Sequence, residues 1–387
     1  MNLLVWYRSL MRSVGATLVK LIATATSGLV SFTTNVIRPV KVICEFTPVQ
    51  EGTGDPSPDN VRPISGWTGC EVYHTGKNMW WTDYTYNDPG GAIKKNGEFI
   101  AINDGGVNTT FLLGGSLKNN KINFKLPKGT YSFSAYSETF SGLYLLFTDG
   151  STWYPRTTKT FDKDMIVQAV RCNLARLAVG TYLWKIQIEQ GEECTDYEPY
   201  QGESIPITFT DPSTGDPMTV YGGTVTLNED GSADLVATQA LWVEDGTRQP
   251  VNAVWHTSGE GDLYNRTLFG RLPHPQHDYA GGYSKYFISD NRMFIGDIND
   301  NGWKNKLCFQ AYRAAGYSFT YSIPKNLSTK AEVAAYFAEN PTTVVYPLAT
   351  PLTYHFDNIG QLNSFLGTNN IWHDMNGSIT AEYYKKQ

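Results

Sequence analysis

Hydrophobic and polar residues alternate in short segments between residues 78 and 200, and turn-forming residues separate these segments. Alternation with a period of two places successive side chains on opposite faces of a strand. Asp88-Pro89-Gly90-Gly91, Pro127-Lys128-Gly129 and Asp149-Gly150 supply turns. Many short strands with such turns predict an antiparallel β-sandwich. The expected strands are Glu98–Ile102, Lys121–Leu126, Thr130–Tyr136, Leu143–Phe147, Met165–Val170 and Tyr182–Glu189.

Strand patterns also flank the predicted sandwich on both sides. Val40–Phe46 and Gly66–Thr75 precede it, and the Pro- and Gly-rich stretch 51–63 between them cannot form the interior of a helix. Residues 205–238 follow it and predict two hairpins, one turning at 211–216 and the other at 228–231. The chain is therefore expected to be mainly β, with smaller β-rich modules beside the sandwich.

The N-terminal segment has a different hydrophobic period. Six hydrophobic residues recur every three or four positions, on one stripe of a helix: Leu4, Tyr7, Met11, Val14, Leu18 and Leu21. We expect residues 1–36 to form a helix for attachment or oligomerisation, with a homotrimer as the hypothesis; a packed amphipathic helix and membrane contact are the alternatives. A membrane partner is not expected, because no run reaches the roughly 18 apolar residues of a spanning helix.

Residues 250–387 are expected to form a C-terminal α+β module with two short helices. In STKAEVAAYFAENP, Thr329 is expected to cap a helix, Glu332 completes the capping box, and Asn340-Pro341 ends the helix. A second helix is predicted over Asp357–Leu366, ended by Gly367. The expected units along the chain are thus 1–36, 37–77, 78–202, 203–249 and 250–387.

Composition narrows the class of protein. The 387 residues include 10 Trp, 24 Tyr and 18 Phe, whereas charged residues make up 18% against a usual value of about 25%. This balance suits a turn-rich β protein and excludes a disordered chain, a coiled-coil rod and a collagen. The net charge of −6 offers no basic field for nucleic acid, so no nucleic-acid partner is expected. The five cysteines form no CxxC pair and are expected to stay reduced, as in a cytosol.

No motif points to catalysis, a metal site or a cofactor, and none of these is expected. Paired carboxylates for glycoside hydrolysis are not excluded by the sequence. Aromatic rings offer the clearer clue, because a planar ring can stack on the C–H face of a sugar. The candidate glycan-stacking residues lie in or beside predicted loops: Trp80, Trp81, Trp153 and Tyr154. Packing in a core or an interface is the alternative for the same rings.

Four segments resemble the tail-associated proteins of siphovirus-type phages and prophages. TPVQEGTGDPSPDNVRPISGWTGCEVYHTGKN at 47–78 resembles a segment that opens many of them, and IQIEQGEECTDYEPYQG at 186–202 resembles the end of their carbohydrate-binding-module-like jelly roll. VYGGTVTLNEDGSADL at 220–235 resembles the hairpin that follows. AENPTTVVYPLATPLTYHF at 338–356 and NNIWHDMNGSITAEY at 369–383 are similar to their C-terminal module.

The resemblance implies a virion structural protein of the tail tip, baseplate or tail fibre that acts in tail assembly and host-surface attachment. The implied partners are other tail or baseplate proteins, further copies of the chain in a homotrimer, and a host cell-surface glycan. The implied location is the virion tail, assembled in the host cytoplasm. The alternatives are a structural adaptor without a host ligand and a glycan-degrading tail enzyme. With the strand patterns, the resemblance also predicts that residues 66–75 pair with the hairpin at 220–235, which makes 78–200 an insertion.

Overall fold

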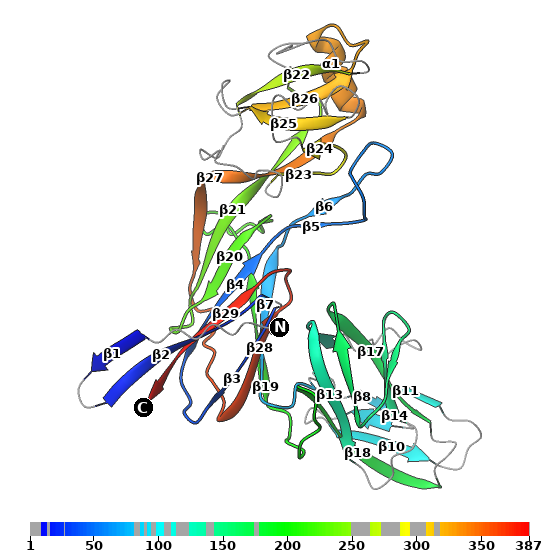
Figure 1. Cartoon of the computed structure of the whole chain (residues 1–387), viewed down its shortest axis with the longest axis vertical. Helices are drawn as coiled ribbons and strands as arrows, with labels where there is room; N and C mark the ends of the chain where they lie inside the picture. The colour runs from blue at the N-terminus through cyan, green and yellow to red at the C-terminus, as the bar shows by residue number, and fades with distance from the viewer. Residues whose placement is uncertain are drawn as a thin grey trace.

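The computed structural model shows a mainly β protein, with a single helix in the part of the chain that it describes (Figure 1). Its strand pairs there are antiparallel, apart from one parallel pair near the helix. The described residues are 9–13, 16–26, 28–80, 86–88, 91–93, 98–103, 110–113, 124–136, 143–173, 178–248, 264–271, 287–294, 307–312 and 318–386.

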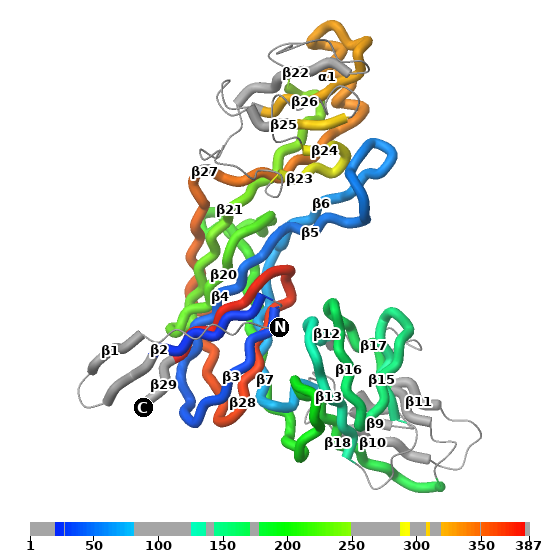
Figure 2. The backbone as a smooth tube through the Cα atoms, in the orientation of Figure 1, coloured from blue at the N-terminus to red at the C-terminus, as the bar shows by residue number. Residues whose placement is uncertain are grey.

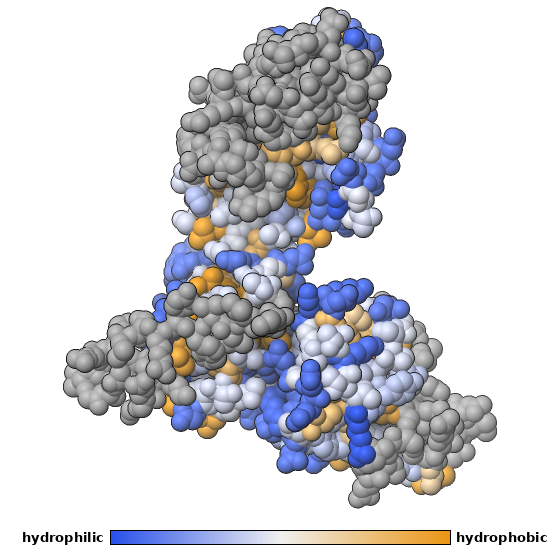
Figure 3. All heavy atoms as spheres, in the orientation of Figure 1, coloured by the Kyte–Doolittle hydropathy of each residue, from blue (hydrophilic) through white to orange (hydrophobic). Residues whose placement is uncertain are grey.

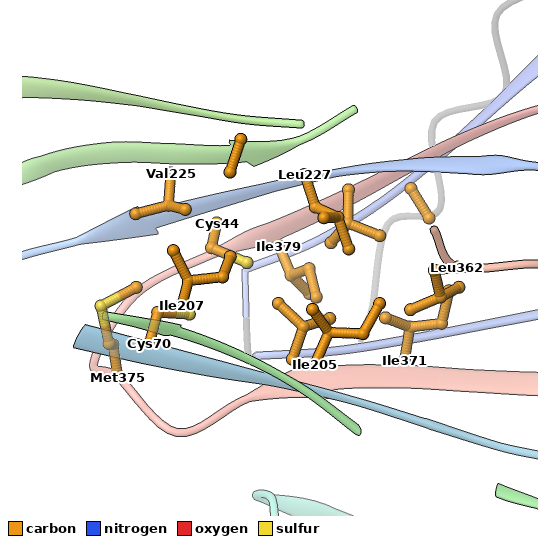
Figure 4. Close-up of a cluster of buried hydrophobic side chains, with 14 of the residues drawn as sticks. Cys44, Cys70, Ile205, Ile207, Val225, Leu227, Leu362, Ile371, Met375 and Ile379 are labelled. Atoms are coloured by element: carbon orange, nitrogen blue, oxygen red, sulfur yellow. The ribbon is translucent and has the colours of Figure 1, made fainter. Parts of the chain in front are cut away.

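The centre of the molecule consists of two sheets that share a hydrophobic core. Figure 4 shows side chains of both sheets in this core, among them Cys44 and Val225 from one sheet and Cys70 and Ile205 from the other. The eight-stranded sheet has the order β1 (Ser9–Ser13), β2 (Ala16–Ala25), β29 (Ile379–Lys386), β4 (Val40–Phe46), β20 (Gly223–Leu227), β21 (Ala233–Glu244), β27 (Thr342–Phe356), β23 (Ile288–Ser289). The four-stranded sheet has the order β19 (Gly202–Thr208), β7 (Gly69–Thr75), β28 (Gly367–His373), β3 (Leu29–Thr34). We call these two sheets the central body.

The predicted sandwich is present, and two sheets share its aromatic-rich core. Strands were expected at six places between residues 98 and 189, and the structure has a strand at each. One sheet has the order β16 (Thr157–Phe161), β13 (Gly129–Tyr136), β18 (Gly180–Gln190), β10 (Glu98–Asn103), β9 (Gly91–Ile93), β8 (Tyr86–Asp88). The other has the order β11 (Thr110–Leu113), β17 (Met165–Asn173), β14 (Leu143–Phe147), β15 (Thr152–Trp153), with β12 (Phe124–Leu126) also on β17.

The sandwich is inserted between two neighbouring strands of the central body. β7 leads into it and β19 leads out of it, and the two strands pair along their whole length, from Gly69–Thr208 to Thr75–Gly202. Figure 2 shows the chain crossing to the sandwich after β7 and returning before β19. Residues 66–75 were expected to pair with the hairpin at 220–235, and this is confirmed only for the bridge between Trp67 and Val220, because β20 itself pairs with β4 and not with β7. The hairpin and β7 therefore lie in different sheets, which this bridge joins.

A small module packs on the far halves of the two longest strands, β21 and β27. It contains the one predicted helix that the structure confirms, α1 (Lys330–Glu339), with Thr329 and Glu332 in a capping box and Asn340 at the end. Val333 and Phe337 of this helix are buried against the module's sheet. The sheet has the order β22 (Tyr264–Arg271), β26 (Ser318–Pro324), β25 (Cys308–Tyr312), β24 (Met293–Phe294). A separate two-stranded ribbon is formed by β5 (Val49–Gln50) and β6 (Ile64–Ser65).

The expected N-terminal helix is wrong, since β1, β2 and β3 occupy the described residues of that segment. Met11 lies in β1 opposite Leu18 of β2, and Leu21 packs against the central core. The physical reason is a partner far away in the chain: β2 pairs with β29 from Leu18 to Ala25, and its β-branched residues suit a strand. The predicted stripe residues Leu4, Tyr7 and Val14 lie outside the described residues.

The second predicted helix, over Asp357–Leu366, is also wrong, because this segment forms bends and extended chain. Asn358 and Gly360 have φ angles of 56° and 138°, which a right-handed helix does not allow. The backbone N–H groups of Ile359 and Gly360 both donate to the carbonyl of Gly231, in the turn between β20 and β21. The segment thus covers that turn instead of forming its own hydrogen bonds.

Candidate functional site

The structure separates the four predicted stacking residues. Trp80 and Trp153 are 0% and 2% exposed and belong to the core of the sandwich, so their assignment as glycan-stacking residues is wrong. The sequence placed them beside loops, but their large apolar area is buried where the two sheets meet. Trp81 lies outside the described residues. Tyr154 is 55% exposed and remains a candidate.

Tyr154 lies next to a second tyrosine on the outer face of the sandwich. Its ring centroid is 5.3 Å from that of Tyr144, and the two ring planes are inclined by 36°. The strand pairing explains this contact: Leu145 is opposite Trp153, so Tyr144 and Tyr154 occupy the next position along the same ladder. The pair forms an aromatic surface at the edge strand β15, which we call the tyrosine pair.

The local sequence determines which way these rings point. In β14, Leu143, Leu145 and Phe147 are buried, whereas Tyr144 and Leu146 lie on the other face. Sequence reasoning missed Tyr144, although the alternation in LYLLF was enough to place it on the face opposite the leucines and the phenylalanine.

Trp153 anchors the position of Tyr154. Its buried ring lies 5.3 Å from Phe133 and 5.6 Å from Phe161, measured between centroids. After Tyr154 the chain turns sharply: Arg156 has a φ of 63°, and its N–H donates to the carbonyl of Phe133 at 2.6 Å. Thr157 Oγ1 donates to the Tyr154 carbonyl at 2.5 Å. Tyr154 is therefore an exposed ring on a well-held backbone, which lowers the entropy cost of a contact.

Charged residues lie near the tyrosine pair, on the neighbouring strand and in the adjacent turn. The Cα atom of Arg171 is paired with that of Tyr144 on the neighbouring strand β17. Asp149 lies in the turn between β14 and β15, and hydrogen bonds from Ser151 lower the pKa of its carboxyl group. Figure 3 shows mostly hydrophilic and intermediate residues on the visible face of the sandwich. Exposed tyrosine rings beside hydrogen-bonding groups can stack on a sugar ring and hydrogen-bond to its hydroxyl groups.

The described part of the chain contains neither a metal-binding cluster nor a membrane-spanning helix. No group of three or more His, Cys, Asp or Glu residues there is placed to hold a metal ion. Its helix is too short and too polar to cross a membrane.

Comparisons with known proteins do not place the chain in a family. No protein-family model matches it, and no curated protein matches it. Structures of infectious bursal disease virus, Gx and Gt strains, align over 99% and 98% of this chain and 83% of theirs, at 7% identity and a TM-score of 0.09. A score this low establishes no shared fold.

Proposed function

We propose that the chain is a structural protein of a phage tail, in the tail tip, baseplate or fibre, which acts in tail assembly and in attachment to the host surface. The segments at 47–78, 186–202, 220–235, 338–356 and 369–383 support the family. The architecture is compatible with it, since β-rich modules are joined through paired strands that can bear load. The proposal still includes homo-oligomerisation, but not through an N-terminal helix.

The observation that carries host attachment is the tyrosine pair on an inserted sandwich. The insertion leaves the strands of the central body paired, so the sandwich can carry a recognition surface without interrupting that body. The exposed ring of Tyr154 beside Tyr144 gives that surface an aromatic contact for a sugar. Several copies in one tail would add weak contacts together, because linked binding events become effectively intramolecular.

The attachment test uses the full chain on a glycan array and on cell envelopes of the bacterium that carries the phage or prophage. We expect Tyr154→Ala and Tyr144→Ala each to weaken glycan binding about 5- to 150-fold, since one aromatic contact contributes about 1–3 kcal/mol. Val179→Ala, which changes another exposed residue of the sandwich, serves as the control. Equal binding by the tyrosine variants and the wild type would remove the tyrosine pair from the proposal.

The second candidate is an adaptor that contacts only other tail proteins. The burial of Trp80 and Trp153 favours it, since two of the four rings expected to face a glycan instead form a core. Electron microscopy of intact virions separates the two candidates. Attachment requires the sandwich to project from the tail surface, whereas an adaptor has the tyrosine pair covered by a neighbouring protein. Absence of the chain from virions would contradict both.

A further inference from the structure

Two cysteines of the central body meet in its core. Cys44 lies in β4 of the eight-stranded sheet, between Ile379 of β29 and Val225 of β20. Cys70 is the second residue of β7 in the four-stranded sheet, opposite Ile207 of β19. Both side chains point into the space between the sheets (Figure 4), and they are 1% and 4% exposed. The two sheets thus bring one thiol each to the same core.

The two thiols are in contact, because a hydrogen bond joins the side chains of Cys44 and Cys70. Both are free thiols in this structure. A disulfide requires side chains that point toward each other from backbones only about 4.4–6.8 Å apart between Cα atoms. Immunoglobulin domains meet this requirement with two cysteines on facing sheets, whose disulfide crosses the core. Cys44 and Cys70 are placed in the same way, on opposite sheets and with their thiols in contact.

The other described cysteines lie elsewhere. Cys308 is buried in a separate small cluster with Met293. Cys194 is exposed, and its Sγ donates to the carbonyl of Phe133 at 3.7 Å. Among the residues that the structure describes, the cysteines that share the central core are therefore Cys44 and Cys70.

We propose that Cys44 and Cys70 form a redox-sensitive cross-link, a disulfide that joins the two central sheets when the chain passes from a reducing to an oxidising environment. The oxidant is a small-molecule disulfide such as glutathione disulfide. One cysteine thiolate attacks it, which forms a mixed disulfide and releases one glutathione. The second cysteine thiolate displaces the other glutathione and completes the Cys44–Cys70 bond. The two cysteines lose two electrons and two protons, and two glutathione thiols are formed.

Burial determines when this reaction takes place. Glutathione does not reach either thiol in the closed body, and the hydrogen bond from Cys44, together with burial, raises the pKa of the Cys70 thiol, so little thiolate is present. The exchange therefore occurs while the two sheets are apart, during folding or local opening. Once the sheets close, the disulfide is as buried as the thiols were.

The cross-link is expected to stabilise the central body. It closes a loop that runs from β4 through the ribbon of β5 and β6 to β7, and a closed loop restricts the unfolded chain. This inference does not depend on the proposed function. The two thiols lie in the core of the central body, whereas the tyrosine pair lies on the sandwich, so failure of either proposal leaves the other standing.

The experiment is refolding of the full chain from urea, in one sample with reduced glutathione alone and in another with a mixture of reduced and oxidised glutathione. Peptide mass spectrometry without reduction is expected to find the Cys44–Cys70 link in the second sample. That sample is expected to unfold about 5–15 °C higher than the first. The chain secreted into a bacterial periplasm, an oxidising compartment, is expected to carry the same link without any refolding step.

Cys44→Ala is expected to abolish both the link and the rise in unfolding temperature, and Cys70→Ala tests the same bond from the other sheet. Cys308→Ala, which removes another buried thiol, is the control and keeps both. Three results would each overturn the proposal: absence of the link from refolded and secreted protein alike, linkage of Cys44 or Cys70 to a different cysteine, or an oxidised chain no more stable than the reduced one.

Discussion

Trp372 of β28 stacks on Tyr73 of β7, with ring centroids 5.4 Å apart and planes inclined by 15°. Trp372 is 2% exposed, and its contacts belong to the core of the sandwich although the residue lies in the central body. The neighbouring residue Ile371 faces the other way, into the core between the two central sheets. Successive side chains of β28 point to opposite faces, so this strand contributes to two cores. The contact between Trp372 and Tyr73 holds the inserted sandwich against the central body.

Trp372→Ala is expected to weaken this contact by about 3–5 kcal/mol, the usual cost of removing a buried aromatic side chain. Native-state hydrogen exchange measures the effect, as lower protection of the β7 and β28 amides. Leu366→Ala, at a residue that is 63% exposed just before β28, is the control and should change protection little. Unchanged protection in Trp372→Ala would mean that the sandwich is held by other contacts.

Asn78 fixes the point where the chain enters the sandwich. Its side chain is buried and makes four hydrogen bonds: Oδ1 accepts from the N–H groups of Trp80 at 3.0 Å and Ile188 at 3.3 Å, and Nδ2 donates to the carbonyls of Ile186 at 3.0 Å and Glu198 at 3.1 Å. The segment that enters the sandwich and the segment that returns from it are thus both hydrogen-bonded to the side-chain amide of Asn78.

Asn78→Ala is expected to destabilise the protein by about 2–4 kcal/mol, because it leaves several buried backbone groups without a partner. Urea unfolding followed by tryptophan fluorescence measures this loss of stability, since Trp80 and Trp184 lie in the adjoining core. Gln201→Ala, at an exposed residue of the returning segment, should leave the midpoint near that of the wild type. A midpoint equally unaffected in Asn78→Ala would rule out this role.

The sequence predicted the structure correctly where an element depends on residues that are close together in the chain. The sandwich strands, the hairpin turn at Asn228–Gly231 and the capped helix α1 were predicted because alternation, turn residues and capping residues act over a few positions. The tyrosine pair was half predicted: Tyr154 was named, and the alternation that exposes Tyr144 was present in the sequence.

The remaining features depend on contacts between distant residues. Leu18 and Leu21 fit a helical stripe equally well, and only pairing with β29, more than 350 residues later, makes them part of a strand. Three of the four hydrogen bonds of Asn78 also join residues over 100 positions apart. Such pairings leave no periodic signal in one sequence, so the central body could not be predicted from it.

Four cysteines of the described chain are free, and their surroundings predict different reactivity. Cys194 is exposed, whereas Cys44, Cys70 and Cys308 are buried. The hydrogen bond with Cys44, together with burial, raises the pKa of the Cys70 thiol well above its ordinary value, which leaves little reactive thiolate.

Iodoacetamide is therefore expected to label Cys194 in the folded protein and the three buried thiols only after denaturation, as read by peptide mass spectrometry. Cys194→Ser is the control that removes the fast-reacting site. Labelling of Cys70 in the folded chain at the rate of Cys194 would contradict the buried position of Cys70 between the central sheets.

Glu244, the last residue of β21, makes stability depend on pH. Its side chain is 1% exposed, and burial raises the pKa of its carboxyl group from 4.5 to about 7. Between these values the folded chain holds a proton that the unfolded chain has lost. The contribution of Glu244 is therefore complete below about pH 4.5 and is lost as the pH rises through about 7, by on the order of 3 kcal/mol.

Glu244→Gln keeps the side chain neutral at every pH, so we expect it to reduce this fall in the free energy of unfolding between pH 5 and pH 8. Urea unfolding at several pH values measures the slope, and Glu339→Gln, at an exposed residue of α1, should retain the wild-type slope. An unchanged slope in Glu244→Gln would mean that another group causes the pH dependence, and would contradict this prediction. Because Glu244 lies at the end of β21 that packs against the helix-bearing module, its ionisation is expected to loosen that module first, which hydrogen exchange of α1 amides would report.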